Sequence, residues 1–567
     1  MNQGTFQVDA PPKHVQADTT FNIASHLTRM ADTAPGRTAV ILSRTLRGGG
    51  RKRPPSITFA QLEDRSNRCA AGLTDAGIQH GTRVLVMLRP GFEFLEVVFA
   101  LFKMGAVPVM IDPGMGLARM LACIRQVAPQ ALIGIPRAHV LRRLRRAAFG
   151  SIKCAVTTAR RSPFGGLTLA RLRERSTAHF ETAETKRNDV AAILFTSGAT
   201  GPPKGVVYEH GMFAAQVNAI QARYSIEPGE IDLPTFPLFG LFGPALGMTC
   251  VIPDMDATRP ARANPANIVD AITIHRVTNT FGSPALWRRV GEYCLRRRTQ
   301  LPTLRRVLIA GAPVSPEIVE MLREALNPTA DVHTPYGATE ALPVSSISGG
   351  ELLDDCADKS RRGHGICVGR PLAEMNVRFI RITDDAIQDW SDDLPVQDGV
   401  FGEIVVAGPV VTKEYFGLPG ATKAAKISEN GRIWHRMGDV GYRDADGRIW
   451  YCGRKAHVVA TGKAALYSVC CEAVFNQHPH VRRSALVGIG PPQARSPVLI
   501  VEPVSRWNTI GRRRKAFLNQ LRELGRTHAV TKDIKTILFH GSLPVDSRHN
   551  AKINREALAK WAESRAR

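Results

Sequence analysis

A loop of glycines, hydroxyl residues and one lysine is the part of this sequence best suited to chemistry. Residues 195–205 read FTSGATGPPKG and follow an apolar run, 190–194, that has the length of a buried strand. Glycine lets successive backbone N–H groups face an anion, hydroxyls add donors, and lysine adds a compact positive charge. The loop is not the common P-loop, because Pro203 stands where that motif has glycine. The pattern favours a phosphate-binding loop over its alternative, a plain glycine turn. The candidate residues are Thr196, Ser197, Gly198, Thr200, Gly201 and Lys204.

The elements around this loop predict an α/β fold. Strands are expected at 38–42, 84–88 and 105–111, with helices beginning at Thr58 and near Phe94, which is the order of a parallel βαβ unit. Later strands are expected at 277–281, 306–310 and just before Tyr336, and Ser315 is expected to cap a helix. Open α/β sheets bind ligands at the carboxyl ends of their strands. The candidates at such ends are Ser283, Gly311, Ala312, Pro313, Tyr336, Gly337, Ala338, Thr339 and Glu340.

The segment 232–243 is aromatic, apolar and broken by proline and glycine. Such a segment cannot form a regular helix, but it can form the wall of an apolar pocket. Phe236, Phe239 and Phe242 are its candidate pocket residues.

The composition indicates a protein of at least two domains with an unusual charge. A chain of 567 residues is too long to fold around a single hydrophobic core. Its content of 44% apolar and 22% charged residues is ordinary for a globular protein. The net charge of +25 makes nucleic-acid binding one function to consider. The basic clusters at 51–53, 142–146, 296–298 and 512–515 are scattered and lack interleaved aromatic residues. An anionic phosphate substrate, an acidic partner or a membrane surface is therefore favoured over nucleic acid.

Cysteine spacing and hydropathy indicate a cytoplasmic protein. The ten cysteines include no C-x-x-C pair, so reduced thiols are favoured over a zinc site or a disulfide framework. The first twenty residues are polar, unlike a signal peptide. The most apolar window, 94–111, contains Glu96 and Lys103, so we expect a buried helix and strand and no transmembrane segment. Peripheral contact with a membrane stays open.

Taken in order, these motifs resemble those of the adenylate-forming superfamily, which includes acyl-CoA synthetases, peptide-synthetase adenylation domains and luciferases. The resemblance implies that ATP converts a carboxylate to an acyl-adenylate and releases pyrophosphate. It implies that the loop 196–204 holds the β- and γ-phosphates, with Mg²⁺ held by Glu340 and Thr200. It also implies that residues 311–313 and Tyr336 frame adenine, together with Gly337 and Ala338. Four further roles follow from it: Thr339 contacts the α-phosphate, Asp439 the ribose and Arg454 the ribose or phosphate, while Lys552 stabilises charge at the carboxylate and α-phosphorus.

The same resemblance implies two domains. Residues 1–452 would form a large adenylate-forming domain with parallel sheets flanked by helices, and residues 453–567 a small mobile α+β domain that carries the catalytic Lys552. The chain departs from the family pattern at Ala199, where serine is usual, and at Ala551, where glycine is usual. The usual glycine-rich loop after the hinge residue Lys455 is also replaced.

Segments 232–244, 251–260, 282–286 and 548–552 resemble the olefin-pathway β-lactone synthetases within this superfamily. That implies adenylation of a long-chain 2-alkyl-3-hydroxy fatty acid, attack by its own 3-hydroxyl and release of AMP, with other enzymes of the pathway as expected partners. The first alternative is a long-chain fatty acyl-CoA ligase. The second is an inactive binding protein, which the intact Lys204, Glu340, Asp439 and Lys552 argue against. His210 and His435 are candidates for the base only by their place in the sequence, and neither is chosen.

Overall fold

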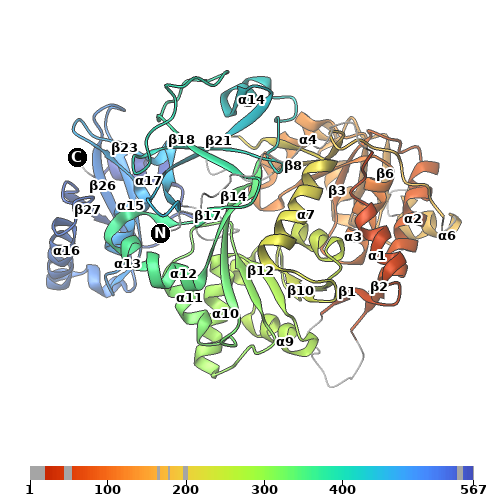
Figure 1. Ribbon diagram of the computed structural model, residues 1–567, viewed down its shortest axis with the longest axis horizontal. Helices are drawn as coiled ribbons and strands as arrows, with labels where there is room; N and C mark the ends of the chain where they lie inside the picture. The colour runs from red at the N-terminus through yellow and green to blue at the C-terminus, as the bar shows by residue number, and fades with distance from the viewer. Residues whose placement is uncertain are drawn as a thin grey trace, which may run out of the picture.

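The computed structural model describes residues 20–43, 54–162, 166–176, 179–195, 202–545 and 553–565. Within these ranges the chain forms large sheets of seven, nine and six strands and a smaller three-stranded sheet near the C-terminus, all with helices packed beside them (Figure 1). Most of the predicted phosphate loop and the predicted catalytic lysine lie outside the described residues. These are Thr196, Ser197, Gly198, Thr200, Gly201 and Lys552.

The seven-stranded sheet confirms the predicted βαβ unit. Strand β3 (Arg83–Met87) pairs in parallel with β4 (Val107–Ile111), and helix α3 (Phe92–Lys103) connects them. The apolar run before the phosphate loop is strand β8 (Val190–Phe195), which pairs in parallel with β4. The order is β7-β6-β5-β3-β4-β8-β9, and only the last pair, β8 with β9 (Gly205–Glu209), is antiparallel. The remaining strands are β5 (Ala131–Gly134), β6 (Cys154–Thr157) and β7 (Leu167–Thr168).

Helix α3 is buried along nearly its whole length, which explains its apolar sequence. Its two charged residues are both paired: Glu96 with Arg173 at 2.9 Å and Lys103 with Glu63 at 2.6 Å. Pairing makes a buried charge tolerable inside a protein core. No helix among the described residues is long and apolar enough to span a membrane.

The nine-stranded sheet runs β17-β15-β14-β13-β12-β10-β11-β1-β2 and is parallel from β14 to β1. The expected short strand before Tyr336 is longer than predicted, because β14 continues through Tyr336 to Ala338 and turns back as the antiparallel β15. Thr339 and Glu340 thus occupy the tip of a hairpin. The strand bounds are β1 (Thr38–Leu42), β2 (Ser56–Thr58), β10 (Ile231–Pro234), β11 (Thr249–Ile252), β12 (Asn279–Gly282), β13 (Arg306–Ile309), β14 (Asp331–Ala338), β15 (Ala341–Ser348) and β17 (Arg370–Pro371).

Helices α2 and α11 begin where the sequence predicts, but only α2 has a side-chain cap. Thr58 caps α2 (Phe59–Asp75) in a capping box with Gln61. Ser315 precedes α11 (Pro316–Arg323) as predicted, but its hydroxyl accepts a hydrogen bond from Arg288 at 3.3 Å and does not cap the helix. The remaining helices of nine or more residues beside the parallel sheets are α1 (Ser25–Thr33), α4 (Leu117–Val127), α5 (Pro136–Leu144), α7 (His210–Tyr224), α9 (Pro265–His275) and α10 (Pro284–Arg297).

The six-stranded sheet is antiparallel and was not predicted. Its order is β16-β22-β21-β19-β18, with β20 paired to the other end of β21. A turn at 444–447 joins its two strands β21 and β22 into a hairpin. Their bounds, with those of the other strands, are β16 (Ile366–Cys367), β18 (Asn376–Ile380), β19 (Gly402–Ala407), β20 (Lys426–Glu429), β21 (Arg432–Arg443) and β22 (Ile449–Arg454).

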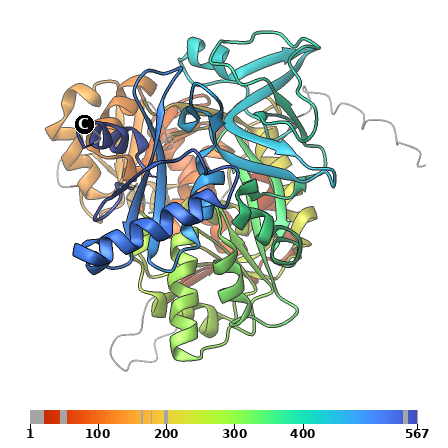
Figure 2. The same ribbon diagram turned by 90° about the vertical axis from the view of Figure 1, so that its left-hand side faces the viewer.

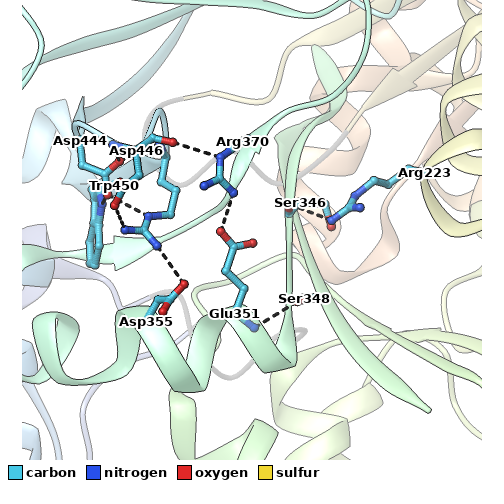
Figure 3. Close-up of polar contacts among 10 residues, drawn as sticks. Arg223, Ser346, Ser348, Glu351, Asp355, Arg370, Asp444, Asp446 and Trp450 are labelled. Atoms are coloured by element: carbon cyan, nitrogen blue, oxygen red, sulfur yellow. Dashed lines mark hydrogen bonds and ion pairs between the residues drawn. The ribbon is translucent and has the colours of Figure 1, made fainter. Parts of the chain in front are cut away.

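A polar network ties the turn of the β21–β22 hairpin to the nine-stranded sheet. Arg448 pairs with Asp444 at 3.0 Å, with Asp355 at 3.3 Å and with Asp446. In Figure 3, Arg370 of β17 reaches both Glu351, at 2.7 Å, and the backbone oxygen of Asp446, at 3.1 Å. This network sets the position of the hairpin whose far end carries Asp439 and Arg454.

The C-terminal part has the predicted α+β composition. Strands β25 (Val481–Ile489) and β26 (Ser496–Pro503) are antiparallel, and β27 (Thr536–Phe539) adds in parallel. Helices α15 (Ser468–Asn476), α16 (Gly511–Arg526) and α17 (Arg555–Glu563) lie beside this sheet (Figure 2). The predicted boundary between residues 452 and 453 falls inside β22, and the division into two domains stays a prediction.

Candidate functional site

A cavity of about 520 Å³ brings together most of the predicted site residues that the structure describes. Its wall is built from the segment after β10, the carboxyl ends of β12 and β13, the tip of the β14–β15 hairpin, and parts of β21 and β22. Ala312, Pro313, Tyr336 and Asp439 are not part of the wall itself. The predicted residues that line it are Lys204, Phe236, Phe239, Phe242, Ser283, Gly311, Gly337, Ala338, Thr339, Glu340 and Arg454.

Tyr336, Asp439 and Arg454 form one hydrogen-bonded group beside this wall. The Tyr336 hydroxyl donates to Asp439 Oδ2 at 2.7 Å, and Arg454 Nη1 lies 3.1 Å from Asp439 Oδ1. Asp439 and Arg454 are directly opposite each other on β21 and β22. Burial and the neighbouring carboxylate raise the pKa of Tyr336 well above 10, so its hydroxyl stays a donor. The carboxylate of Asp439 likewise raises the pKa of Arg454, which keeps a fixed positive charge at the wall.

Glu340 is held by two residues that the sequence did not indicate. The Tyr415 hydroxyl donates to Glu340 Oε1 at 2.7 Å, and the Thr412 backbone N–H donates to the Glu340 carbonyl oxygen at 2.9 Å. Burial, followed by the charge of Glu340, raises the pKa of Tyr415, which therefore stays protonated. Lys204 Nζ lies 4.7 Å from the centre of the Tyr415 ring, so this ring joins the predicted phosphate-binding lysine to the predicted metal ligand.

A buried lysine stands behind this group. Lys426 donates to the backbone oxygen of Thr412 and lies 3.4 Å from its hydroxyl. Burial lowers the pKa of Lys426 to about 7, while the charge of Glu340 acts in the opposite direction. No periodicity or motif marks Tyr415, Thr412 or Lys426. Tyr415 and Thr412 contact Glu340, which is more than 70 residues away in the sequence, and Lys426 contacts Thr412.

The structure separates the two histidines that the sequence left open. His210 lies in the core, where its Nδ1 accepts a hydrogen bond from the Ile23 backbone N–H at 3.2 Å. His435 lines the cavity, and its Nδ1 lies 3.2 Å from the Ala425 carbonyl oxygen. A carbonyl can only accept, so Nδ1 carries the hydrogen and Nε2 is the basic nitrogen. Burial, with Lys426, Lys204 and Arg454 nearby, lowers the pKa of His435 well below 6.5, and its ring is neutral.

The other end of the cavity is apolar. Phe239 stacks on Phe281 with a centroid distance of 3.7 Å and an interplanar angle of 10°, and Phe236 and Phe242 lie within 6 Å of Phe239. Ser283 lines this region but also caps α10, because its hydroxyl accepts from the Leu286 N–H at 3.4 Å. A second cavity of about 40 Å³ shares Phe239, Phe242 and Phe281 with the first. Phe236, Phe239 and Phe242 of the segment 232–243 thus line the cavity, and their role as a substrate pocket stays a prediction.

Comparison with known proteins places this fold and cavity in a family. The family model described as AMP-binding enzyme matches residues 27–416. The chain belongs to the AMP-binding enzyme family. This AMP-binding enzyme is 46% identical to an olefin beta-lactone synthetase of Xanthomonas campestris pv. campestris, over 96% of the chain and 98% of the relative. It is 45% identical to an olefin beta-lactone synthetase of Stenotrophomonas maltophilia over the same shares of the two chains.

A solved structure of the anthranilate CoA ligase AuaEII in complex with anthranoyl-AMP shares the fold of this AMP-binding enzyme. The TM-score is 0.78 at 19% identity, with 96% of this chain and 98% of that chain covered. The predicted superfamily and α/β fold class are thus confirmed. As a member of an ATP-binding, adenylate-forming family, the protein is an enzyme of the ligase type that acts on a small-molecule acid.

Proposed function

We propose that the enzyme activates a long-chain 2-alkyl-3-hydroxy fatty acid with ATP and closes it to a β-lactone, releasing pyrophosphate and AMP. The observation that carries this proposal is the identity of 45–46%, over nearly the whole chain, to two relatives named olefin beta-lactone synthetase. The cavity supports it, because polar groups suited to a nucleotide and an apolar pocket suited to alkyl chains meet in one space.

The polar end of the cavity suits ATP. The Tyr336 ring and Gly311 would frame the adenine, and Asp439 with Arg454 would hold the ribose. Lys204 would pair with the β- and γ-phosphates, and Thr339 would donate to the α-phosphate. The remaining loop residues and Lys552 keep the roles expected from the family pattern, with Lys552 stabilising the charge that develops at the α-phosphorus.

Glu340 fits a magnesium ion bound together with the nucleotide. It presents a carboxylate at the cavity wall, and carboxylate oxygen is a preferred ligand of this hard cation. Among the described residues no three His, Cys, Asp or Glu side chains gather as a metal cluster, so phosphate oxygens would supply most of the other ligands. Thr200, the second expected ligand, lies outside the described residues. When bound, Mg²⁺ would neutralise charge on the phosphates.

The apolar end suits an acid with two alkyl chains. The phenylalanines of 236–242 border the main cavity, and the stacked pair Phe239–Phe281 lines both this cavity and the smaller one. One chain would follow the phenylalanine wall, and the other would point toward the second space.

His435 is our candidate for the base in lactone closure. The 3-hydroxyl proton would pass to His435 Nε2 as the hydroxyl oxygen bonds to the acyl carbon. The bond between that carbon and the phosphate oxygen of AMP then breaks, and AMP leaves with the bonding electrons. The nucleophile is already attached to the electrophile, and effective molarities for well-oriented groups reach about 10⁵ M. No thiol is required for this step.

The test is to incubate the purified enzyme with ATP, Mg²⁺ and a long-chain 2-alkyl-3-hydroxy acid, with and without CoA. Pyrophosphate is measured and the organic product is identified by mass spectrometry. We expect a β-lactone whose yield does not depend on CoA. A thioester that forms only with CoA would make the enzyme an acyl-CoA ligase, and no pyrophosphate with any fatty acid would contradict the proposed substrate class.

A further inference from the structure

Exposed apolar and basic side chains gather in one short stretch of the C-terminal part, residues 504–515. Val504, Trp507 and Ile510 are 54%, 69% and 58% exposed and follow the end of β26. Directly after them, at the start of α16, come four exposed basic residues: Arg512, Arg513, Arg514 and Lys515. We call residues 504–515 the basic–aromatic patch. Figure 1 shows α16 at the outer left edge of the molecule, and Figure 2 shows it facing the viewer.

The patch does not stabilise the fold in an evident way. A helix N-terminus carries partial positive charge, so the three arginines in the first turn of α16, with Lys515 just after them, oppose the helix dipole. The Trp507 ring is exposed to solvent instead of covering core residues. Side chains that are unfavourable for the isolated fold point to a partner of opposite charge with an apolar component.

We propose that the basic–aromatic patch is a docking surface for the anionic face of a phospholipid bilayer. Arginine and lysine attract anionic headgroups, and tryptophan with aliphatic side chains inserts at the boundary between headgroups and acyl chains. The net charge of +25 adds long-range attraction to such a surface. The choice of a lipid surface over an acidic protein rests in part on the proposed function, because an acid with two long alkyl chains partitions into membranes.

The chain offers a matched control for this proposal. The cluster at 142–146 has four arginines around Leu144, which is 73% exposed, but it has no aromatic ring. The double variant Arg512→Gln/Arg513→Gln therefore removes the same charge as the double variant Arg145→Gln/Arg146→Gln. All four arginines are exposed, and removal of Arg512 and Arg513 relieves repulsion from the helix dipole, so both variants should fold.

The experiment is flotation of the full-length protein with vesicles of phosphatidylcholine alone or with one third phosphatidylglycerol, at about physiological salt. We expect binding only to the anionic vesicles. Arg512→Gln/Arg513→Gln should weaken binding by about 30-fold, because each arginine near an anionic membrane surface raises the affinity about fivefold. Trp507→Ser should weaken it by roughly tenfold, because the apolar ring no longer inserts. The control at 145 and 146 should change it less than threefold, as expected for charges away from the contact.

Equal binding to neutral vesicles, an equal loss in the control, or no vesicle binding at all would overturn the proposal. Binding to an acidic protein without binding to vesicles would also overturn it. Pyrophosphate release from ATP and the 2-alkyl-3-hydroxy acid is measured for every variant in the absence of vesicles. Failure of that assay in the wild type would contradict the proposed function, whereas failure of flotation alone would contradict only the membrane surface.

Discussion

At the scale of single residues, Glu340 and Tyr415 can be tested as a pair. Glu340→Gln removes the charge proposed to hold Mg²⁺, and we expect pyrophosphate release to fall by about 10²–10³-fold. Tyr415→Phe keeps the ring beside Lys204 but removes the 2.7 Å hydrogen bond to Glu340. Its loss should be roughly tenfold, the effect of one hydrogen bond to a charged group. Initial rates of pyrophosphate release over a range of Mg²⁺ concentrations measure both losses. Equal losses in the two variants would contradict the assignment of Glu340 as the metal ligand and Tyr415 as the residue that positions it.

His435 makes a sharper residue-scale prediction, because its role is limited to the second step. In His435→Asn the amide N–H can still donate to the Ala425 carbonyl oxygen, but no basic nitrogen takes the place of His435 Nε2. We expect adenylation to stay within about threefold of wild type and lactone formation to fall by about 100-fold. Rapid quench should then show acyl-adenylate accumulating. If both steps fall together, His435 is a structural residue and not the base.

The pKa of His435 also predicts the pH profile of lactone closure. Because its pKa lies well below 6.5, the ring is already neutral at pH 6.5, so the closure rate should be constant above that pH and fall only at lower values. Single-turnover rates at several pH values measure this.

At the scale of elements, the stacked rings of Phe239 and Phe281 join the segment after β10 to the end of β12. Both rings line the main cavity and the smaller one. Phe281→Ala should open a path between the two, and we expect the ratio of kcat/KM for a longer-chain acid over a shorter one to rise about tenfold. Phe281→Leu, which keeps most of the volume, should change that ratio less. A uniform loss for all chain lengths would mean that the stack serves packing alone.

At the scale of the whole molecule, buried histidines link stability to pH. Burial lowers the pKa of His210 to about 4, whereas the unfolded chain has a value near 6.5, so the unfolded state binds more protons between these values. Stability from His210 is therefore present above pH 6.5 and is lost as the pH falls toward 4. Burial raises the pKa of Asp232 to about 7, which acts in the opposite direction over the same range.

A variant isolates this contribution. Asn at position 210 can accept the Ile23 N–H but does not titrate, so His210→Asn should gain stability relative to wild type as the pH falls. We expect the difference in the free energy of unfolding to change by about 1.4 kcal/mol per pH unit between 6.5 and 4. Urea unfolding at several pH values measures it, and a pH-independent difference would show that burial does not lower the pKa of His210 in the native state.

The sequence by itself determined the parallel sheets and most of the candidate residues that gather at the polar end of the cavity. Parallel strands are buried on both faces, so runs such as 84–88 and 190–194 are visible as unbroken apolar segments. Lys204, Glu340, Asp439 and Arg454 were predicted from short local motifs that resemble those of the adenylate-forming superfamily, and the structure places them close together.

Only the tertiary structure decided the antiparallel six-stranded sheet and the support around Glu340. Strand β21 contains buried His435, Arg436 and Asp439, so no polar–apolar alternation marks it as a strand. These polar side chains are satisfied by partners far away in sequence, such as Glu403 for Arg436 and Tyr336 for Asp439. The same holds for Tyr415 beside Glu340 and for His435 at the cavity. Local sequence encodes backbone propensity and motif chemistry, whereas contacts between distant segments exist only after the chain has folded.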